Sequence, residues 1–171
     1  SLEKTDLRAL RHPLIVLRHR NCISNDLEVS PAQAIVLSGP NAGGKTVFLK
    51  AVGLAHLMAA SGLPVCADHA ALARMDFMVA EIGDAQDLDH ELSTFAAHIQ
   101  NLSSALSQAN SHALILVDEI CAGTDPEQGS ALARSIIDEC LSRGGTCLVT
   151  SHFGHLKRVA TLDTRYRNAS F

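Results

Sequence analysis

Glycines, a lysine and a hydroxyl stand together in the first third of the sequence, at a spacing suited to phosphate binding. The stretch GPNAGGKT fits the pattern G-x-x-x-x-G-K-[ST]. Glycines let the backbone wrap tightly, so that successive N–H groups and the next helix's positive end face an anion. Lys45 would reach the β- and γ-phosphates, and the Thr46 hydroxyl would join a Mg²⁺ shell. The sequence therefore predicts a nucleotide-binding loop formed by Gly39, Pro40, Asn41, Ala42, Gly43, Gly44, Lys45 and Thr46.

Two acidic residues follow the apolar run LILV. A buried strand that ends at this point would place Asp118 and Glu119 at its carboxyl end, where ligands of α/β proteins bind. Asp118 suits the Mg²⁺ shell together with Thr46, and Glu119 would orient and deprotonate an attacking water. The alternative is a pair of acids at an ordinary strand end. In combination with the glycine-rich loop, the pair indicates nucleotide hydrolysis.

Two further places offer site residues, and each has a structural alternative. In VTSHF, His152 follows another buried strand, where its side chain would face the γ-phosphate or the water. A histidine at this position is also compatible with a purely structural, hydrogen-bonded role. In LSTF, Ser93 and Thr94 stand at a predicted helix start. They are either a plain N-cap or a phosphate-facing helix end that meets nucleotide on a second subunit.

The elements that position these residues alternate between strands and helices. Short apolar, β-branched runs are separated by segments with helical periodicity, which predicts a mostly parallel sheet with helices on both faces. Asp125 and Pro126 form a helix start of the N-cap and first-turn proline type. The expected strands are 34–38, 76–82, 113–119, 146–151 and 166–171, and the expected helices are 44–61, 93–109 and one from 126 that stops at Gly144–Gly145.

Composition limits the classes of protein to which the chain can belong. With 171 residues, 47% hydrophobic and 19% charged, it suits a single globular domain. No apolar run approaches a membrane span, and no signal peptide opens the chain. The five cysteines form no C-x-x-C pair and indicate reduced thiols in the cytoplasm. The nine histidines show no zinc-ligand spacing.

The charge balance does not favour a domain that grips nucleic acid by itself. The formal net charge is −4, whereas DNA-binding domains normally carry a basic surplus or a basic face. Basic residues concentrate only between Arg8 and Arg20 and between Lys157 and Arg167. If the protein binds nucleic acid, we expect other regions of a longer chain to make the contacts.

Taken together, four stretches resemble the ATPase domain of the MutS DNA mismatch-repair family. They are GPNAGGKT, ELSTFAAHIQNL, LILVDEICAGTDPEQGSALA and VTSHFGHLK, and the similarity extends from about His12 to Ala169. Within the family, GGKTVFLKAVGL and AGTDPEQGSALA are more similar to the second bacterial branch than to the mismatch-recognising one. That branch is associated with suppression of recombination and with ribosome rescue, and usually carries a C-terminal Smr nuclease domain.

The resemblance implies a P-loop NTPase of ABC-ATPase type, with residues 1–171 as one ATPase domain of a longer chain. It implies ATP hydrolysis with Mg²⁺ in a homodimer whose sites are completed by Ser93 and Thr94 from the other subunit. It also implies DNA binding through regions absent from this chain, and no membrane. By position, the family pattern assigns phosphate contacts to Asn41 and Gly43–Thr46, the metal to Asp118, the water to Glu119, and the switch histidine to His152. Asn25 matches a nucleotide-side segment before the core strand, and Gly123–Asp125 matches the loop along the dimer seam.

Some features depart from the family pattern, and other functions are compatible with the same loop. The family often has an aromatic residue for adenine near Cys22 or Ile23, and neither is aromatic here. An ABC-type transporter-coupling ATPase would carry a serine, two glycines and a glutamine where this chain has LSTFAAHIQNL. A nucleotide-binding module without turnover is the remaining alternative.

Overall fold

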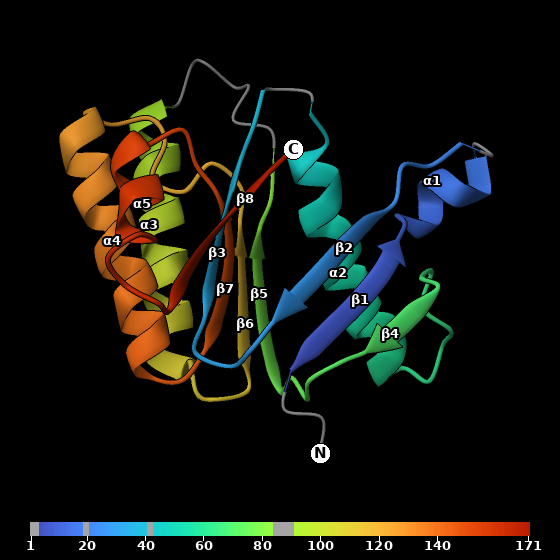
Figure 1. Cartoon of the computed structure of the whole chain (residues 1–171). Coiled ribbons are helices and arrows are strands. Elements are labelled where there is room, and N and C mark those ends of the chain that lie inside the picture. The colour runs from blue at the N-terminus through green and yellow to red at the C-terminus, as the bar shows by residue number, and fades with distance from the viewer. Residues whose placement is uncertain (1–3, 19–20, 41–42, 84–90) are drawn as a thin grey trace.

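The computed structural model describes residues 4–18, 21–40, 43–83 and 91–171, and only the backbone of residues 91–94. Its centre is a sheet with strand order β5-β6-β7-β3-β8, in which every pairing is parallel. The carboxyl ends of all five strands therefore lie at one edge, at the top of Figure 1. The mostly parallel sheet expected from the sequence is confirmed. The strands are β3 (Ala34–Ser38), β5 (Phe77–Glu81), β6 (Ala113–Val117), β7 (Thr146–Thr150) and β8 (Tyr166–Ser170).

Helices cover both faces of this sheet (Figure 1). Helix α2 (Lys45–Ala60) lies on one face, and α3 (Glu91–Gln108), α4 (Pro126–Ser142) and α5 (Gly154–Val159) lie on the other. Successive strand residues point to opposite faces, so β3 divides its side chains between two cores. Val36 packs into the core under α3 and α4, whereas Ile35 and Leu37 pack into the core that includes α2. This two-sided burial explains why the strands read as continuous apolar runs.

A second, antiparallel sheet was not predicted. It has the order β2-β1-β4, with β1 (Thr5–Leu10), β2 (Asn25–Val29) and β4 (His69–Ala71), and α1 (Pro13–Arg18) follows β1. The sheet joins the α2 core through the buried side chains of Leu7 and Leu27. Its strands are short and carry charged residues, and the β1–β2 register shifts between Leu7 and Leu10. These features weaken the alternating pattern by which an isolated strand is recognised.

The predicted helix ends agree with the structure to within two residues. The Asp125 carboxylate accepts hydrogen bonds from the N–H groups of Glu127 (3.0 Å) and Gln128 (3.1 Å), so it caps α4 as expected. Helix α3 begins at Glu91, before the predicted start. Ser93 and Thr94 therefore lie in its first turn and not in front of it.

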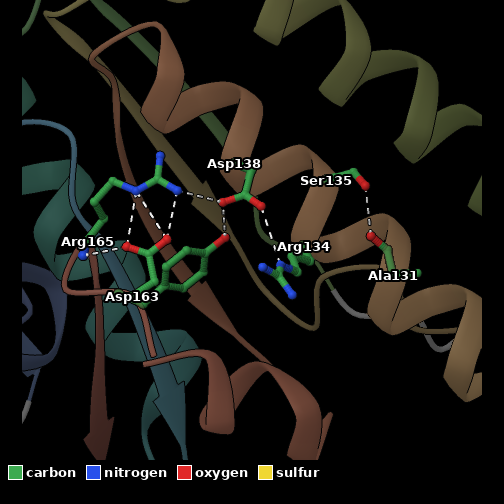
Figure 2. A network of polar contacts seen from close by, with 7 residues as sticks. Ala131, Arg134, Ser135, Asp138, Asp163 and Arg165 are labelled. Carbon is green, nitrogen blue, oxygen red and sulfur yellow. Dashed lines mark hydrogen bonds and ion pairs between the residues drawn. The ribbon is translucent and has the colours of Figure 1, made fainter. Parts of the chain in front are cut away.

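A polar network joins α4 to the start of β8, as Figure 2 shows. Asp138 accepts hydrogen bonds from the Tyr166 hydroxyl at 2.9 Å and from Arg165 at 3.3 Å. Arg165 also pairs with Asp163 at 2.7 Å. Burial raises the pKa of Tyr166, and the bond to Asp138 adds to the effect. The phenol thus remains a neutral donor, and it holds one end of β8 while the other end reaches the glycine-rich loop.

The structure also describes the cysteines and the possible membrane-spanning helices considered in the sequence analysis. All five cysteines are free, and those at 121, 140 and 147 are buried. Burial raises the pKa of the Cys121 thiol to about 11, which keeps it in the unreactive protonated form. In the part of the chain that the structure describes, no helix combines the length and apolarity that crossing a membrane requires.

Candidate functional site

The glycine-rich loop leaves β3 through two positions that require glycine. Gly39 has φ 151°, and a Cβ atom there would lie 2.8 Å from the carbonyl oxygen of Phe171. Gly44 has φ 93° and directly precedes α2. Between them, the N–H of Gly43 donates to the carbonyl oxygen of Pro40 at 3.1 Å. Other residues are strained or crowded at these two positions, so the glycines set the path of the loop.

Lys45 is folded over this loop. Its side chain is only 6% exposed, and Nζ donates hydrogen bonds of 2.8 Å to the carbonyl oxygens of both Gly39 and Pro40. The ammonium group thus lies against the backbone that is predicted to surround the phosphates. Asn41 and Ala42 lie outside the described residues, so their predicted phosphate contacts stay predictions.

The structure brings Thr46 and Asp118 into direct contact. The Thr46 hydroxyl donates to Oδ2 of Asp118 at 2.5 Å, from the first turn of α2 to the residue after the apolar run of β6. The Asp118 N–H is bound by the Glu81 carbonyl oxygen at the end of β5, at 2.9 Å. A hydroxyl and a carboxylate supply the hard oxygen ligands that Mg²⁺ prefers, so these residues fit the implied metal.

Two oxygen ligands from the protein are enough for Mg²⁺. Among the described residues, no group of three or more His, Cys, Asp or Glu side chains is placed to hold a metal ion. Mg²⁺ usually takes one or two protein ligands and completes its octahedron with phosphate oxygens and water. Thr46 and Asp118 therefore suit a Mg²⁺ that arrives with a nucleotide.

Glu119 and His152 meet beside this pair. Oε1 of Glu119 lies 3.5 Å from Nε2 of His152, and their side chains are 43% and 52% exposed. They follow β6 and β7, which are neighbours in the sheet. The sequence placed each at a strand end, and the structure adds that they lie next to each other. Both remain accessible to a water molecule, a nucleotide or a second subunit.

The turn after β6 has unusual backbone geometry. Glu119 and Cys121 have φ values of 51° and 56°, in the left-handed region that non-glycine residues avoid. Each such residue costs roughly 1–2 kcal/mol relative to the right-handed form. Ile120 lies between them and is 1% exposed. The surrounding structure must therefore hold this turn in place.

Sequence reasoning missed Thr150, which joins the two acidic residues. Its Oγ1 donates to Oδ1 of Asp118 and accepts from the N–H of Glu119, each at 2.6 Å. Thr150 is the last residue of β7 and is fully buried. The available signal was a hydroxyl two residues before His152, on a strand that is otherwise apolar except for its first residue.

Asn25 lies apart from the acidic pair. It opens β2 and lines a cavity of about 170 Å³ together with Phe48 and Phe171. The two rings are tilted against each other, with centroids 5.2 Å apart. The Phe171 N–H is bonded to the Ser38 carbonyl oxygen at 2.9 Å, just before Gly39, so the cavity adjoins the glycine-rich loop. Aromatic rings thus reach this region from α2 and from the residue after β8, although residues 22 and 23 supply none.

Ser93 and Thr94 belong to the first turn of α3, and their side chains lie outside the described part of the structure. The helix is tied to the site one turn later. There, Nδ1 of His98 lies 2.9 Å from Oε2 of Glu81, whose carbonyl oxygen holds the Asp118 N–H. Within the described residues, the loop after β3 and the ends of β6 and β7 thus bring together part of the predicted set, namely Lys45, Thr46, Asp118, Glu119 and His152, whereas Asn25 belongs to β2 and Ser93 and Thr94 belong to α3.

Comparison with known proteins identifies the family. Residues 35–171 match the model of MutS domain V. The chain is 45% identical over 168 residues to an endonuclease MutS2 of Anaeromyxobacter sp. (strain Fw109-5), covering 96% of this chain and 21% of that protein. It is 45% identical over 168 residues to an endonuclease MutS2 of Thermus thermophilus, covering 98% of this chain and 22% of that protein. The chain thus spans about a fifth of the length of these relatives. The chain belongs to the MutS family, and residues 35–171 are the segment that matches its domain V.

Proposed function

We propose that this chain binds ATP with Mg²⁺ and hydrolyses it to ADP and phosphate, as the ATPase domain of a MutS-type DNA repair or recombination-control protein. The observation that carries the proposal is the contact of Thr46 with Asp118, beside which Glu119 and His152 lie 3.5 Å apart. A hydroxyl, two carboxylates and an imidazole thus converge at the edge of the parallel sheet where its strands end, which is where α/β proteins bind ligands.

The loop residues bind the phosphates in this proposal. Backbone N–H groups of Gly39 and of residues 41–46, which include Asn41 and Ala42, would surround the β- and γ-phosphates, and Pro40, which has no N–H, shapes the loop. Lys45 exchanges its bonds to the Gly39 and Pro40 carbonyl oxygens for phosphate oxygens, which are stronger acceptors because they are charged. Thr46 and Asp118 would hold the Mg²⁺, which when bound would supply positive charge next to the phosphates.

Glu119 and His152 act on the attacking water. The Glu119 carboxylate accepts a proton as the water attacks the γ-phosphorus, and the ADP leaving group departs from the opposite side. His152 donates a hydrogen bond to the γ-phosphate or to the water and keeps it in line. The half-exposed position of both side chains leaves room for the terminal phosphate in front of them.

In the same proposal, the nucleotide base binds in the cavity beside the glycine-rich loop. The cavity next to Asn25 is walled partly by Phe48 and Phe171 and partly by polar groups such as Arg167. Aromatic rings and an amide suit a flat base that carries hydrogen-bonding edges. Asn25 is therefore the residue that we assign to this side of the nucleotide.

Dimerisation and DNA coupling complete the proposal. Ser93 of the partner subunit and Thr94 of the partner subunit would contact the nucleotide, so that ATP closes a homodimer and hydrolysis reopens it. The chain has net charge −4, which supports DNA contacts through other parts of a longer, cytoplasmic protein. The word endonuclease belongs to the names of the relatives. That the longer protein carries an Smr nuclease domain remains a prediction.

Two measurements on the intact protein test this function: phosphate release from ATP with Mg²⁺, and molecular mass with and without ATP. We expect Glu119→Gln to abolish release while it retains ATP and stabilises the dimer, because the amide cannot accept the proton. Glu139→Gln is the matched control, since Glu139 is exposed on α4 and pairs only with Arg143 in the described structure.

Three outcomes would replace the proposal. ATP binding without phosphate release by the unchanged protein indicates a nucleotide-binding module without turnover. Equal release by the unchanged protein and by Glu119→Gln removes Glu119 from the mechanism. A co-purifying membrane partner revives the transporter-coupling alternative.

A further inference from the structure

Thr150 uses both hydrogen-bonding capacities of its hydroxyl at the candidate site. The Glu119 amide can only donate, so the hydroxyl oxygen accepts from it and the hydroxyl hydrogen is left to point to Asp118. The hydroxyl accepts from Glu119 at 2.6 Å and donates to Oδ1 of Asp118 at 2.6 Å. Since Thr150 is fully buried, water does not compete for either bond.

The bond to Glu119 supports a backbone conformation that is otherwise unfavourable. Glu119 has φ 51°, and its N–H donates to the hydroxyl of Thr150, the last residue of β7. The Thr150 carbonyl oxygen also accepts from the Ile120 N–H at 3.1 Å. A single residue of β7 thus binds two successive amides of the turn that carries Glu119.

The bond from Thr150 engages one oxygen of the Asp118 carboxylate and leaves the other oxygen for Thr46. Oδ1 is engaged by Thr150, and Oδ2 is engaged by Thr46. With Oδ1 held, the plane of the carboxylate is fixed and Oδ2 faces the first turn of α2, where the metal ligand is needed. Groups behind metal ligands orient them in this way in many proteins.

We propose that Thr150 is a positioning residue for hydrolysis, which sets the Asp118 carboxylate for Mg²⁺ and the Glu119 side chain for water through one hydroxyl. The inference rests on the proposed ATPase function, but its geometry is independent of the dimer and of DNA. The competing explanation is that Thr150 only satisfies buried polar groups and contributes to stability.

The test compares Thr150→Val with Thr150→Ser in the intact protein. Valine keeps the shape and removes the hydroxyl, whereas serine keeps the hydroxyl. We expect valine to lower kcat roughly 10- to 100-fold, the usual cost of losing a group behind a metal ligand, and to raise the Mg²⁺ concentration for half-maximal ATP binding. The KM for ATP measured at saturating Mg²⁺ should change far less, and serine should restore most of kcat.

A second readout does not depend on turnover. Amide hydrogen exchange at Glu119, measured without nucleotide, should become faster in Thr150→Val and remain slow in Thr150→Ser. Thr146→Val is the matched control, because Thr146 is a buried threonine at the opposite end of the same strand. If Thr150→Val does not fold, Thr150→Cys serves the same comparison, since a thiol is a weak hydrogen-bonding group of similar size.

The results separate this inference from the proposed function. Absence of ATP hydrolysis in the unchanged protein would count against the function, and exchange at Glu119 would still show whether the Thr150 hydroxyl holds the turn that carries Glu119. Normal hydrolysis in the unchanged protein, together with equal kcat, Mg²⁺ dependence and Glu119 exchange in Thr150→Val, would overturn the inference. Loss of stability alone, matching that of Thr146→Val, would also overturn it.

Discussion

Oε2 of Glu81 lies 2.9 Å from Nδ1 of His98 and connects the end of β5 to α3, the helix that carries Ser93 and Thr94. The Glu81 carbonyl oxygen accepts the N–H of Asp118 at 2.9 Å. One residue thus contacts both the helix assigned to the other subunit's nucleotide and the strand end assigned to the metal. This arrangement favours a role for the pair beyond local stability.

On the proposed function, we expect His98→Ala to lower the rate of ATP hydrolysis while it leaves the free energy of unfolding nearly unchanged. The His98 side chain is half exposed, so its loss should change the free energy of unfolding by less than about 1 kcal/mol. A misplaced α3 should reduce turnover by roughly 2- to 30-fold, which corresponds to about 0.5–2 kcal/mol of coupling. Steady-state phosphate release and chemical denaturation measure the two effects. His112→Ala is the control, because His112 is an exposed histidine directly before the first residue of β6. Equal effects of both variants on the rate would exclude the coupling role of His98.

The glycine-rich loop, the acidic pair and the five parallel strands were recognisable because their signals are local. A strand of the parallel sheet is buried on both faces and therefore appears as a short apolar run. The loop is recognisable because glycine, lysine and a hydroxyl occur at fixed spacing. Burial and spacing are both properties of consecutive residues.

The antiparallel sheet and Thr150 were missed because their signals are not local. β4 has only three residues, and it pairs with β1, which lies far earlier in the sequence: Arg8 is opposite His69 and Asp6 is opposite Ala71. Thr150 acts through bonds to Asp118 and Glu119, which stand 32 and 31 residues away. A lone hydroxyl at a strand end has no spacing signal, and its partners become visible only when β6 and β7 lie side by side.

Replacement of Thr46 tests the metal site. We expect Thr46→Val to raise the Mg²⁺ requirement for ATP binding at least about 10-fold, because the proposed site would lose one of the two oxygen ligands assigned to Thr46 and Asp118. Thr46→Ser keeps the hydroxyl and should retain the original dependence. Titration of nucleotide affinity against Mg²⁺ measures the effect, and an unchanged Mg²⁺ requirement in the valine variant would remove Thr46 from the metal shell.

Gly129 allows α4 to approach the loops on both sides of the site. A Cβ atom there would lie 2.8 Å from the Phe153 ring, 2.9 Å from the Cys121 carbonyl oxygen and 3.1 Å from Thr124. Alanine favours helices by about 1 kcal/mol over glycine, yet we expect Gly129→Ala to destabilise by about 1–3 kcal/mol, because backbone must move. The displacement should also lower kcat, since Cys121 and Phe153 flank Glu119 and His152.

The matched control for this change is Gly154→Ala in α5. A Cβ atom there meets nothing within 4 Å, so alanine should leave stability unchanged or raise it. Thermal unfolding of both variants measures the difference. Equal stability of the two variants would show that α4 shifts without cost and that the close approach at Gly129 is not required.

His56 should make the protein sensitive to mild acid. It is buried in α2, and burial lowers its pKa from 6.5 to about 4. The unfolded chain therefore takes up the proton first, so stability is fully present above about pH 6.5 and is lost as the pH falls towards about 4. The loss amounts to about 3 kcal/mol for this shift.

Urea unfolding between pH 7 and pH 4.5 measures this dependence. We expect His56→Gln to reduce the fall in the free energy of unfolding across this range, because glutamine has no proton to gain. His69→Gln removes an exposed histidine of β4 and should leave the fall unchanged. If His56→Gln and the unchanged protein lose stability in parallel, the acid sensitivity arises elsewhere, and the buried imidazole is protonated in the folded chain without penalty.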